Sequence, residues 1–126
     1  MADERFAISF GALRPLFVVL GLLPRLCYVE RRGDELWVRM SWAFSSHFPV
    51  AAIASIAPYT GSVGGIGVHG FGGRWLVNGS SSNIVAVTLS TPHRAYVLGF
   101  PVRLGELRVS LETPQRFISA CAQLAA

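Results

Sequence analysis

Residues 36 to 45 alternate between two kinds of side chain, and this pattern restricts the fold of the chain more than any other. Every second position is apolar: Leu36, Val38, Met40, Trp42 and Phe44. The positions between them are mixed and mostly small or polar: Trp37, Arg39, Ser41, Ala43 and Ser45. A period of two residues is typical of a strand that buries one face in an antiparallel sheet. The chain is therefore expected to build a sheet with one buried and one solvated face.

Shorter stretches of strand character predict further strands on both sides of this one. They cover residues 5–10, 26–30, 53–58, 74–78, 83–89, 95–100 and 107–111. Turns are expected at Gly33-Asp34, Asn78-Gly79 and Thr91-Pro92, because these residue types favour tight turns. Residues 13–23 are apolar throughout, so the pattern there does not separate a strand from a short helix.

The last part of the chain has a helical pattern. Thr113 is a favourable N-cap residue, and Pro114 suits the first helical position. An apolar stripe follows at helical spacing: Phe117, Ile118, Cys121 and Leu124. A length of 126 residues is typical of one domain. We therefore expect a single mainly β domain over residues 1–126, with about seven antiparallel strands in a barrel or sandwich that one C-terminal helix closes.

Three local motifs follow one another in an order shared with a known fold. They are Phe48-Pro49 with the apolar stretch up to residue 56, then Gly65-Ile66-Gly67-Val68 followed by Arg74-Trp75 and residues 84–87, and last residues 107–110 leading to Thr113-Pro114 and Phe117-Ile118. Together they span most of residues 26–124. In this order they resemble bacterial pleckstrin-homology-like (PH-like) domains of an uncharacterised family.

The resemblance implies a seven-stranded antiparallel sheet closed by a helix. It also implies that the domain binds a partner and does not catalyse a reaction. It implies no activity, since a fold does not determine a function. PH domains that bind phosphoinositides carry several basic residues around their first two strands. This chain offers only Arg14 and Arg25 there, separated by an apolar run. Inositol phosphate binding is therefore not expected.

A glycine-rich stretch, GSVGGIGVHGFGGRW, covers residues 61–75 and contains a formal G-x-G-x-x-G match at Gly65–Gly70. In dinucleotide-binding folds this motif opens a helix, and an acidic residue about 20 positions later holds the ribose. Here Gly72-Gly73 follows, and no carboxylate stands between Glu35 and Glu106. We therefore expect no nucleotide and no cofactor, and interpret the stretch as a connection that leads into the strand at Arg74.

Residues that could carry catalysis or hold a metal do not occur in the required patterns. The histidines, at positions 47, 69 and 93, lack metal-binding spacing, and Cys27 and Cys121 form no C-x-x-C pair. No G-x-S-x-G motif is present, and the seven carboxylates stand in turns, at caps and near the start of the chain. The chain is therefore predicted to be no enzyme, with no catalytic and no metal-binding residue. Both cysteines are expected to be buried free thiols, and a disulfide between them is the alternative.

All eleven basic residues are arginine, and the net charge is +4. Their wide spacing does not favour nucleic-acid binding, which usually concentrates charge. Arg14 and Arg25 enclose the apolar residues 15–24, a run too short to span a bilayer, which needs about 20 residues. This run is interpreted as a buried core segment or as a patch that touches a membrane.

These observations predict a non-enzymatic PH-like interaction module for a protein, a peptide or a membrane surface. The candidate binding residues are His69, Phe71, Arg74, Arg14 and Arg25. The start of the chain has mixed charge, so we expect a cytoplasmic protein, with peripheral membrane contact left open. Self-association along a sheet edge is also left open. The alternative is a small β-barrel, or a small enzyme built on it, that holds an apolar molecule with His69 and Arg74 near its mouth.

Overall fold

The computed structural model of the chain describes residues 4–8, 15, 19, 26–59, 67–71, 73–78 and 83–125. Its elements are β1 (Glu4–Ala7), β2 (Cys27–Arg32), β3 (Glu35–Met40), β4 (Phe44–Pro49), the short 3-10 helix η2 (Val50–Ala52), β5 (Ile53–Pro58), β6 (Gly67–Phe71), β7 (Arg74–Asn78), β8 (Ile84–Val97), β9 (Phe100–Ser110) and α2 (Pro114–Ala125). The predicted mainly β fold with a C-terminal helix is confirmed.

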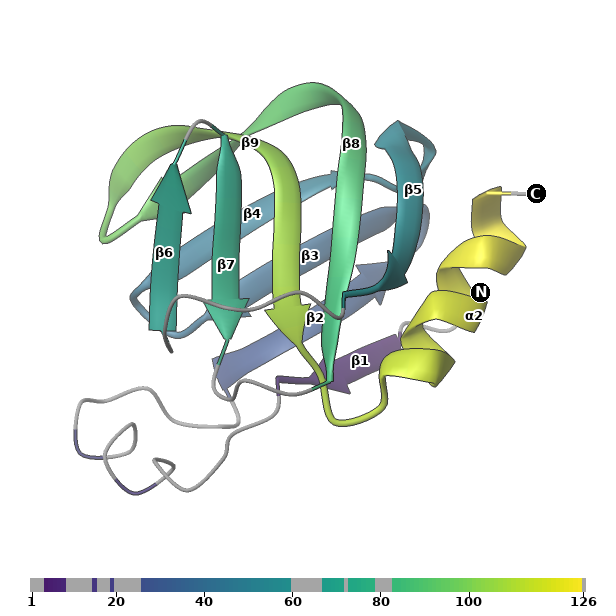
Figure 1. Cartoon of the computed structure of the whole chain (residues 1–126), viewed down its shortest axis with the longest axis horizontal. Helices are drawn as coiled ribbons and strands as arrows, with labels where there is room; N and C mark the ends of the chain where they lie inside the picture. Colours follow the sequence, from purple (N-terminus) through teal and green to yellow (C-terminus); the bar gives the residue numbers. More distant parts are fainter. Residues whose placement is uncertain are drawn as a thin grey trace.

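The described strands form one sheet in the order β1-β2-β3-β4-β8-β9-β7-β6, and β5 pairs with β8 beside this path. All pairs are antiparallel except β7 and β9, which run parallel. The sheet curls into a half-barrel, with β6, β7, β9, β8 and β5 in front of β4, β3, β2 and β1 (Figure 1). Long β8 and β9 bend over from the front layer to the back one, and the helix α2 lies at the opposite end from their connecting turn.

The turn predicted at Thr91-Pro92 was wrong, because both residues lie within strand β8. The structure continues through these residues as one strand, which pairs with β5 at Leu89 and with β4 at Ala95. The β8–β9 register shifts between Thr88 and His93. Pro92 lies in this irregular part of the ladder, where an absent N–H breaks no regular pairing. A proline in such a bulge bends a strand instead of ending it.

The alternating stretch at residues 36–45 is divided into two strands. Met40 of β3 pairs with Phe44 of β4, and Ser41, at φ +48°, begins the three-residue turn between them. The turn breaks the period of two, so Ala43 is buried while Trp42 is 55% exposed. The prediction that Trp42 belongs to the buried face was wrong for this reason. The remaining apolar positions of the stretch are buried as expected.

Part of the glycine-rich stretch is a strand. Residues 67–71 form β6, which pairs with β7 in a hairpin whose turn includes Gly73 at φ +85°. The interpretation of these five residues as a connection was therefore wrong, because a strand is held by backbone hydrogen bonds, which glycine residues can also form. Within the described residues, the position where a nucleotide-binding motif would open a helix is occupied by this hairpin.

The core lies inside the curl, and α2 covers it at one end. Phe117 and Cys121 of the predicted apolar stripe are buried, and the Phe117 ring meets Phe6 of β1 edge-on at 5.1 Å. An isolated bridge between Ile8 and Leu111 joins the ends of β1 and β9 at the same end. Burial of these apolar side chains, at about 25 cal/mol for each Å² removed from water, holds the helix on the sheet.

Candidate functional site

Of the candidate residues chosen from the sequence, His69, Phe71 and Arg74 come together in the β6–β7 hairpin. Arg14 and Arg25 lie outside the described residues, and so does the run between them apart from Pro15 and Val19, which are both exposed. His69 and Phe71 belong to β6, at the edge of the sheet in the described part of the chain. Their backbones pair with Leu76 and Arg74 of β7.

Arg74 takes part in an ion-pair cluster. Its Nε lies 3.3 Å from Oε2 of Glu106, and Nε of Arg108 lies 2.7 Å from the same oxygen. The Arg108 guanidinium also sits 4.0 Å from the centre of the Tyr59 ring. One carboxylate thus serves two arginines on the outer face of β7 and β9, and Arg74 has its counter-charge within the chain.

A groove of about 690 Å³ lies elsewhere, on the outer face of β2, β3, β4 and the adjoining part of β8. Its aromatic lining residues are Tyr28, Trp37, Trp42 and Tyr96. Its basic and titratable ones are Arg32, Arg39, Arg94, His47 and His93. Three serines, Val38 and Gly99 complete the lining. This volume falls in the range of ligand-binding pockets, about 300–1,000 Å³.

Cross-strand register brings these side chains together from distant parts of the sequence. Tyr28 pairs with Arg39, Arg39 with Ser45, and Ser45 with Tyr96, which makes one row across four strands. Trp37 and His47 pair in a neighbouring row. Residues directly opposite one another project from the same face of a sheet, with Cβ atoms about 5 Å apart. The groove therefore follows from the pairing of β3 with β4 and of β4 with β8.

Contacts between side chains hold one side of the groove in place. Trp37 stacks on His47 with ring centres 4.3 Å apart, and the Arg32 guanidinium lies 4.5 Å from the Trp37 ring centre. Glu30 accepts hydrogen bonds from Arg32 at 2.5 Å and from Arg5 at 2.9 Å. Partial burial works against its charge, but the bonds from the two arginines prevail and hold the pKa of Glu30 below its ordinary value.

The permanently charged side chains that line the groove are all arginines. None of the described residues that line it is Asp or Glu, and the sequence has no acidic residue between Glu35 and Glu106. Arg94 on β8 stands directly opposite Arg103 on β9, and both are exposed. Neither forms an ion pair with another described residue. Like charges in this position repel, so the pair favours an anion from outside the chain.

The backbones beneath this arginine pair are fixed by two side chains. The Ser46 hydroxyl donates to the Arg94 carbonyl at 2.8 Å, and the Trp75 indole N–H donates to the Arg103 carbonyl at 3.1 Å. Fixed backbones keep the two guanidinium groups on one face, although each side chain remains free to turn toward a ligand.

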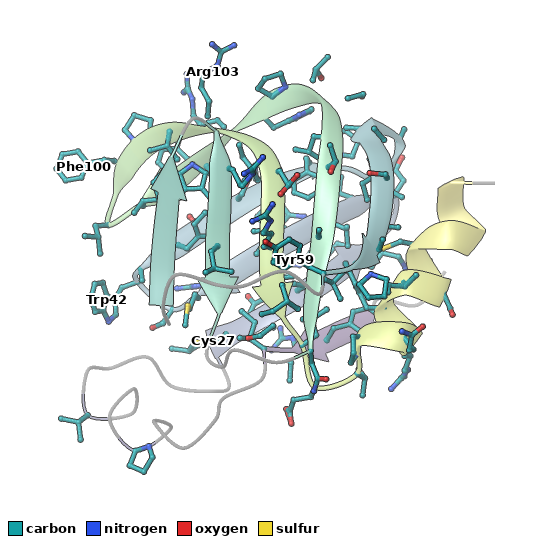
Figure 2. The ribbon with its side chains drawn as sticks, in the orientation of Figure 1. Cys27, Trp42, Tyr59, Phe100 and Arg103 are labelled. Carbon is teal, nitrogen blue, oxygen red and sulfur yellow. The ribbon has the colours of Figure 1, made fainter. Side chains whose placement is uncertain are left out.

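Three apolar side chains stand exposed beside one end of the groove. Trp42, Leu98 and Phe100, here named the apolar tip, are 55%, 57% and 71% exposed. Trp42 and Leu98 belong to the β3–β4 and β8–β9 turns, and Phe100 begins β9. A hydrogen bond of 3.0 Å from the Leu98 N–H to the Ala43 carbonyl joins the two turns. Figure 2 shows Trp42 and Phe100 projecting from the same end of the molecule, at the left.

Neither cysteine lines the groove, although Cys27 lies close to Ser41 and Arg39, which do. Both are buried free thiols, as predicted. Burial raises the pKa of Cys27 and of Cys121 to about 11, against weaker effects of Arg39 and Arg31 in the opposite direction. A thiol in this state is protonated at neutral pH and is a poor nucleophile. Within the described ranges, no three His, Cys, Asp or Glu side chains gather as metal ligands. No helix in that part of the chain has the length and apolar character that crossing a membrane requires.

The sequence contained part of the signal for this site. The alternation in residues 36–45 already placed Trp37, Arg39 and Ser45 on the face opposite the core, and the gap in carboxylates was visible. Pairing between β4 and β8, which adds Tyr96 and Arg94, connects residues about 50 positions apart. No local pattern indicates that register, so the groove was missed.

Comparisons of the chain with protein-family models, with curated proteins and with solved structures find no match.

Proposed function

We propose that this chain is a non-catalytic PH-like binding module that holds an acidic segment of a partner protein in its groove. The observation that carries the proposal is the lining of the groove, in which arginines and aromatic rings stand together without a carboxylate. The curled half-barrel capped by a C-terminal helix supports the PH-like assignment at the level of architecture. The large buried side chains between the layers favour an outer site over an internal ligand cavity.

The chemistry of the lining suits an extended acidic peptide. Arginine binds carboxylates through paired, charge-assisted hydrogen bonds. Arg39 and Arg94 come from strands on either side of β4 and both line the groove. Aromatic faces between them offer apolar contact for the rest of the peptide. The groove crosses β2, β3, β4 and β8, and a path over four strands is about 15 Å long, or four to five extended residues.

Ser46, one of the serines that line the groove, has a structural role. The Ser46 hydroxyl donates to a backbone carbonyl, and His47 Nδ1 lies 3.8 Å from Oε2 of Glu35 in an exposed pair at the surface. Catalysis by a serine would need its hydroxyl directed at a histidine base in a protected site. These contacts support binding as the function.

Fluorescence anisotropy with a labelled peptide of alternating glutamate and tyrosine tests the proposal. A peptide with lysine at the glutamate positions is the control. We expect saturable binding of the acidic peptide only, and a loss of about tenfold in affinity for Arg39→Gln or Arg94→Gln, because each removes a charge-assisted contact. Arg74→Gln removes the same charge outside the groove and should bind like the unmodified chain.

Two results would contradict this function. One is binding of the lysine peptide as tightly as the glutamate peptide. The other is an Arg39→Gln/Arg94→Gln double variant that retains full affinity, since the groove would then contribute nothing to recognition.

A further inference from the structure

We infer that the apolar tip docks on an anionic lipid bilayer, with Trp42, Leu98 and Phe100 entering the interface and Arg94 and Arg103 meeting the lipid headgroups. This inference goes beyond the proposed function: Trp42 and Arg94 also line the groove, whereas Leu98, Phe100 and Arg103 lie outside it. The inference is carried by three observations: the exposure of the tip, the backbone conformation of Leu98 and the charge around both.

The tip projects into solvent. Its three side chains are each more than half exposed, although each is large and apolar. In Figure 2, Trp42 and Phe100 point away from the rest of the protein. A protein partner would need a matching pocket, whereas a bilayer interface accepts any convex apolar group and is the preferred environment of tryptophan. The projection of these exposed apolar side chains therefore favours a lipid surface.

The exposed residue Leu98 has a backbone conformation that is unfavourable for leucine. It has φ +52°, and with Gly99 at φ +85° it forms the two-residue turn between β8 and β9. Such a turn favours asparagine or glycine at its first position, because a branched or bulky side chain crowds the backbone there. Leu98 is 57% exposed and gains little from packing. Its presence is explained if an apolar surface covers it in the bound state.

The charge beside the tip selects an anionic surface. Arg103 follows Phe100 by three residues on β9, and Arg94 is its cross-strand partner on β8. Three residues of strand span about 10 Å, which matches the depth of about 5–10 Å that interfacial apolar groups reach. The two arginines thus come to the level of the headgroups when the tip is inserted. Residues 36–105, which include the tip and both arginines, contain no carboxylate that would repel the headgroups.

Vesicle co-sedimentation tests this docking with the full chain. Vesicles of phosphatidylcholine alone are compared with vesicles in which about a third of the lipid is phosphatidylglycerol. We expect binding to the anionic vesicles only. Leu98→Asn/Phe100→Thr should weaken it by more than about tenfold through lost apolar burial. Arg94→Gln and Arg103→Gln should each weaken it by about fivefold, and Arg74→Gln, whose charge is already paired, should not.

Insertion itself has a spectroscopic readout. Lipids brominated on their acyl chains should quench tryptophan emission when the protein binds. Trp42→Phe should remove most of that quenching while vesicle binding is retained, because phenylalanine keeps an apolar ring at the tip and Trp37 and Trp75 lie elsewhere. This separates insertion of the tip from simple electrostatic adhesion.

Several outcomes overturn the inference: no binding to either kind of vesicle, equal binding to both, full binding by Leu98→Asn/Phe100→Thr, or quenching that persists in Trp42→Phe. Concentration-dependent dimerisation that Leu98→Asn/Phe100→Thr abolishes would also overturn it, since the tip would then be covered by a second copy. Circular dichroism verifies that each variant is folded. Leu98 and Phe100 do not line the groove, so their variant should still bind the acidic peptide, and failure of one proposal is distinguishable from failure of the other.

Discussion

Two phenylalanines at opposite ends of the molecule have opposite environments. Phe117 of α2 is 1% exposed and packs against Phe6 at the helix end. Phe100, at the start of β9, is 71% exposed beside the other turns of the sheet. The helix end has a covering element of its own, and the tip end has none among the described residues. The comparison teaches that apolar character alone does not place a residue in the core, because burial depends on whether the chain supplies a partner.

Truncation of the two rings measures this difference directly. Phe117→Ala should lower the free energy of unfolding by about 3–5 kcal/mol, since it removes a fully buried ring and leaves a cavity. Phe100→Ala should change it by no more than about 0.5 kcal/mol, as expected for an exposed position. Urea unfolding followed by circular dichroism gives both values. Similar losses for the two variants would show that the tip is packed in solution and would break the comparison.

The stability of the protein at alkaline pH tests whether the core is equally shielded from water at the two ends. Cys121 lies at the helix end, and Cys27 pairs with Met40 next to the turn that carries Trp42. Burial raises both pKa values from 9.0 to about 11 in the folded state. The folded thiols lose their protons at a higher pH than the unfolded ones. The free energy of unfolding is therefore unaffected by the thiols below about pH 9 and falls as pH rises toward about 11. Each thiol should cost about 1.4 kcal/mol per pH unit in this window.

Urea unfolding as a function of pH measures this slope. Cys27→Ala and Cys121→Ala should each remove about half of it, and the slopes of the two variants should agree. An unchanged slope in Cys27→Ala would mean that water reaches the core beneath the tip, so that exposure there is not confined to the outermost side chains.

The turn residue of the tip predicts a smaller effect of the opposite sign. Leu98→Asn should stabilise the chain by about 0.5–1 kcal/mol, because asparagine adopts positive φ with less strain than leucine. Thermal unfolding detects the gain as a higher Tm. A loss of stability would show that Leu98 packs against the protein, and the tip would then resemble the helix end more than the structure indicates.

The arginine pair predicts the smallest effect. Arg103→Glu places opposite charges across β8 and β9 and should raise stability by about 0.2–1 kcal/mol at low salt. The gain should shrink as salt is added. Arg74→Glu, in contrast, should destabilise the chain, since it sets two carboxylates against each other at Glu106. Equal responses of the two variants would mean that the paired and unpaired arginines do not differ.

Local patterns in the sequence were sufficient for the elements at the helix end. The spacing of Phe117 and Cys121 predicted both the helix and its buried face, and the alternation of Leu36, Val38 and Met40 predicted β3. These patterns succeed because each element buries one continuous face, which leaves a periodic trace in the sequence.

The tip and the groove depend on features that leave no such trace. A three-residue turn reversed the expected orientation of Trp42, and a bulge at Pro92 joined two predicted strands into β8. Arg74 and Arg103 have similar surroundings in the sequence. The strand register, however, places Arg74 opposite Glu106 and Arg103 opposite Arg94. Pairing between distant strands decides these outcomes, and a sequence pattern within one strand does not report it.

Charge is distributed unevenly between the two ends of the protein, with mixed signs at the helix end and two arginines toward the tip. Asp34 and Glu35 stand at the β2–β3 turn, whose Asp34 carbonyl accepts the Val50 N–H at 2.8 Å, and η2 packs against α2. Glu112 lies just before the helix, and Arg31, Arg32 and Arg116 stand near these carboxylates, so the charges at the helix end largely cancel. Arg94 and Arg103 lie toward the tip and form no ion pair with another described residue. A negatively charged surface exerts a torque on such a molecule within a Debye length of about 8–10 Å. The protein should therefore arrive tip first, already oriented before any side chain makes contact.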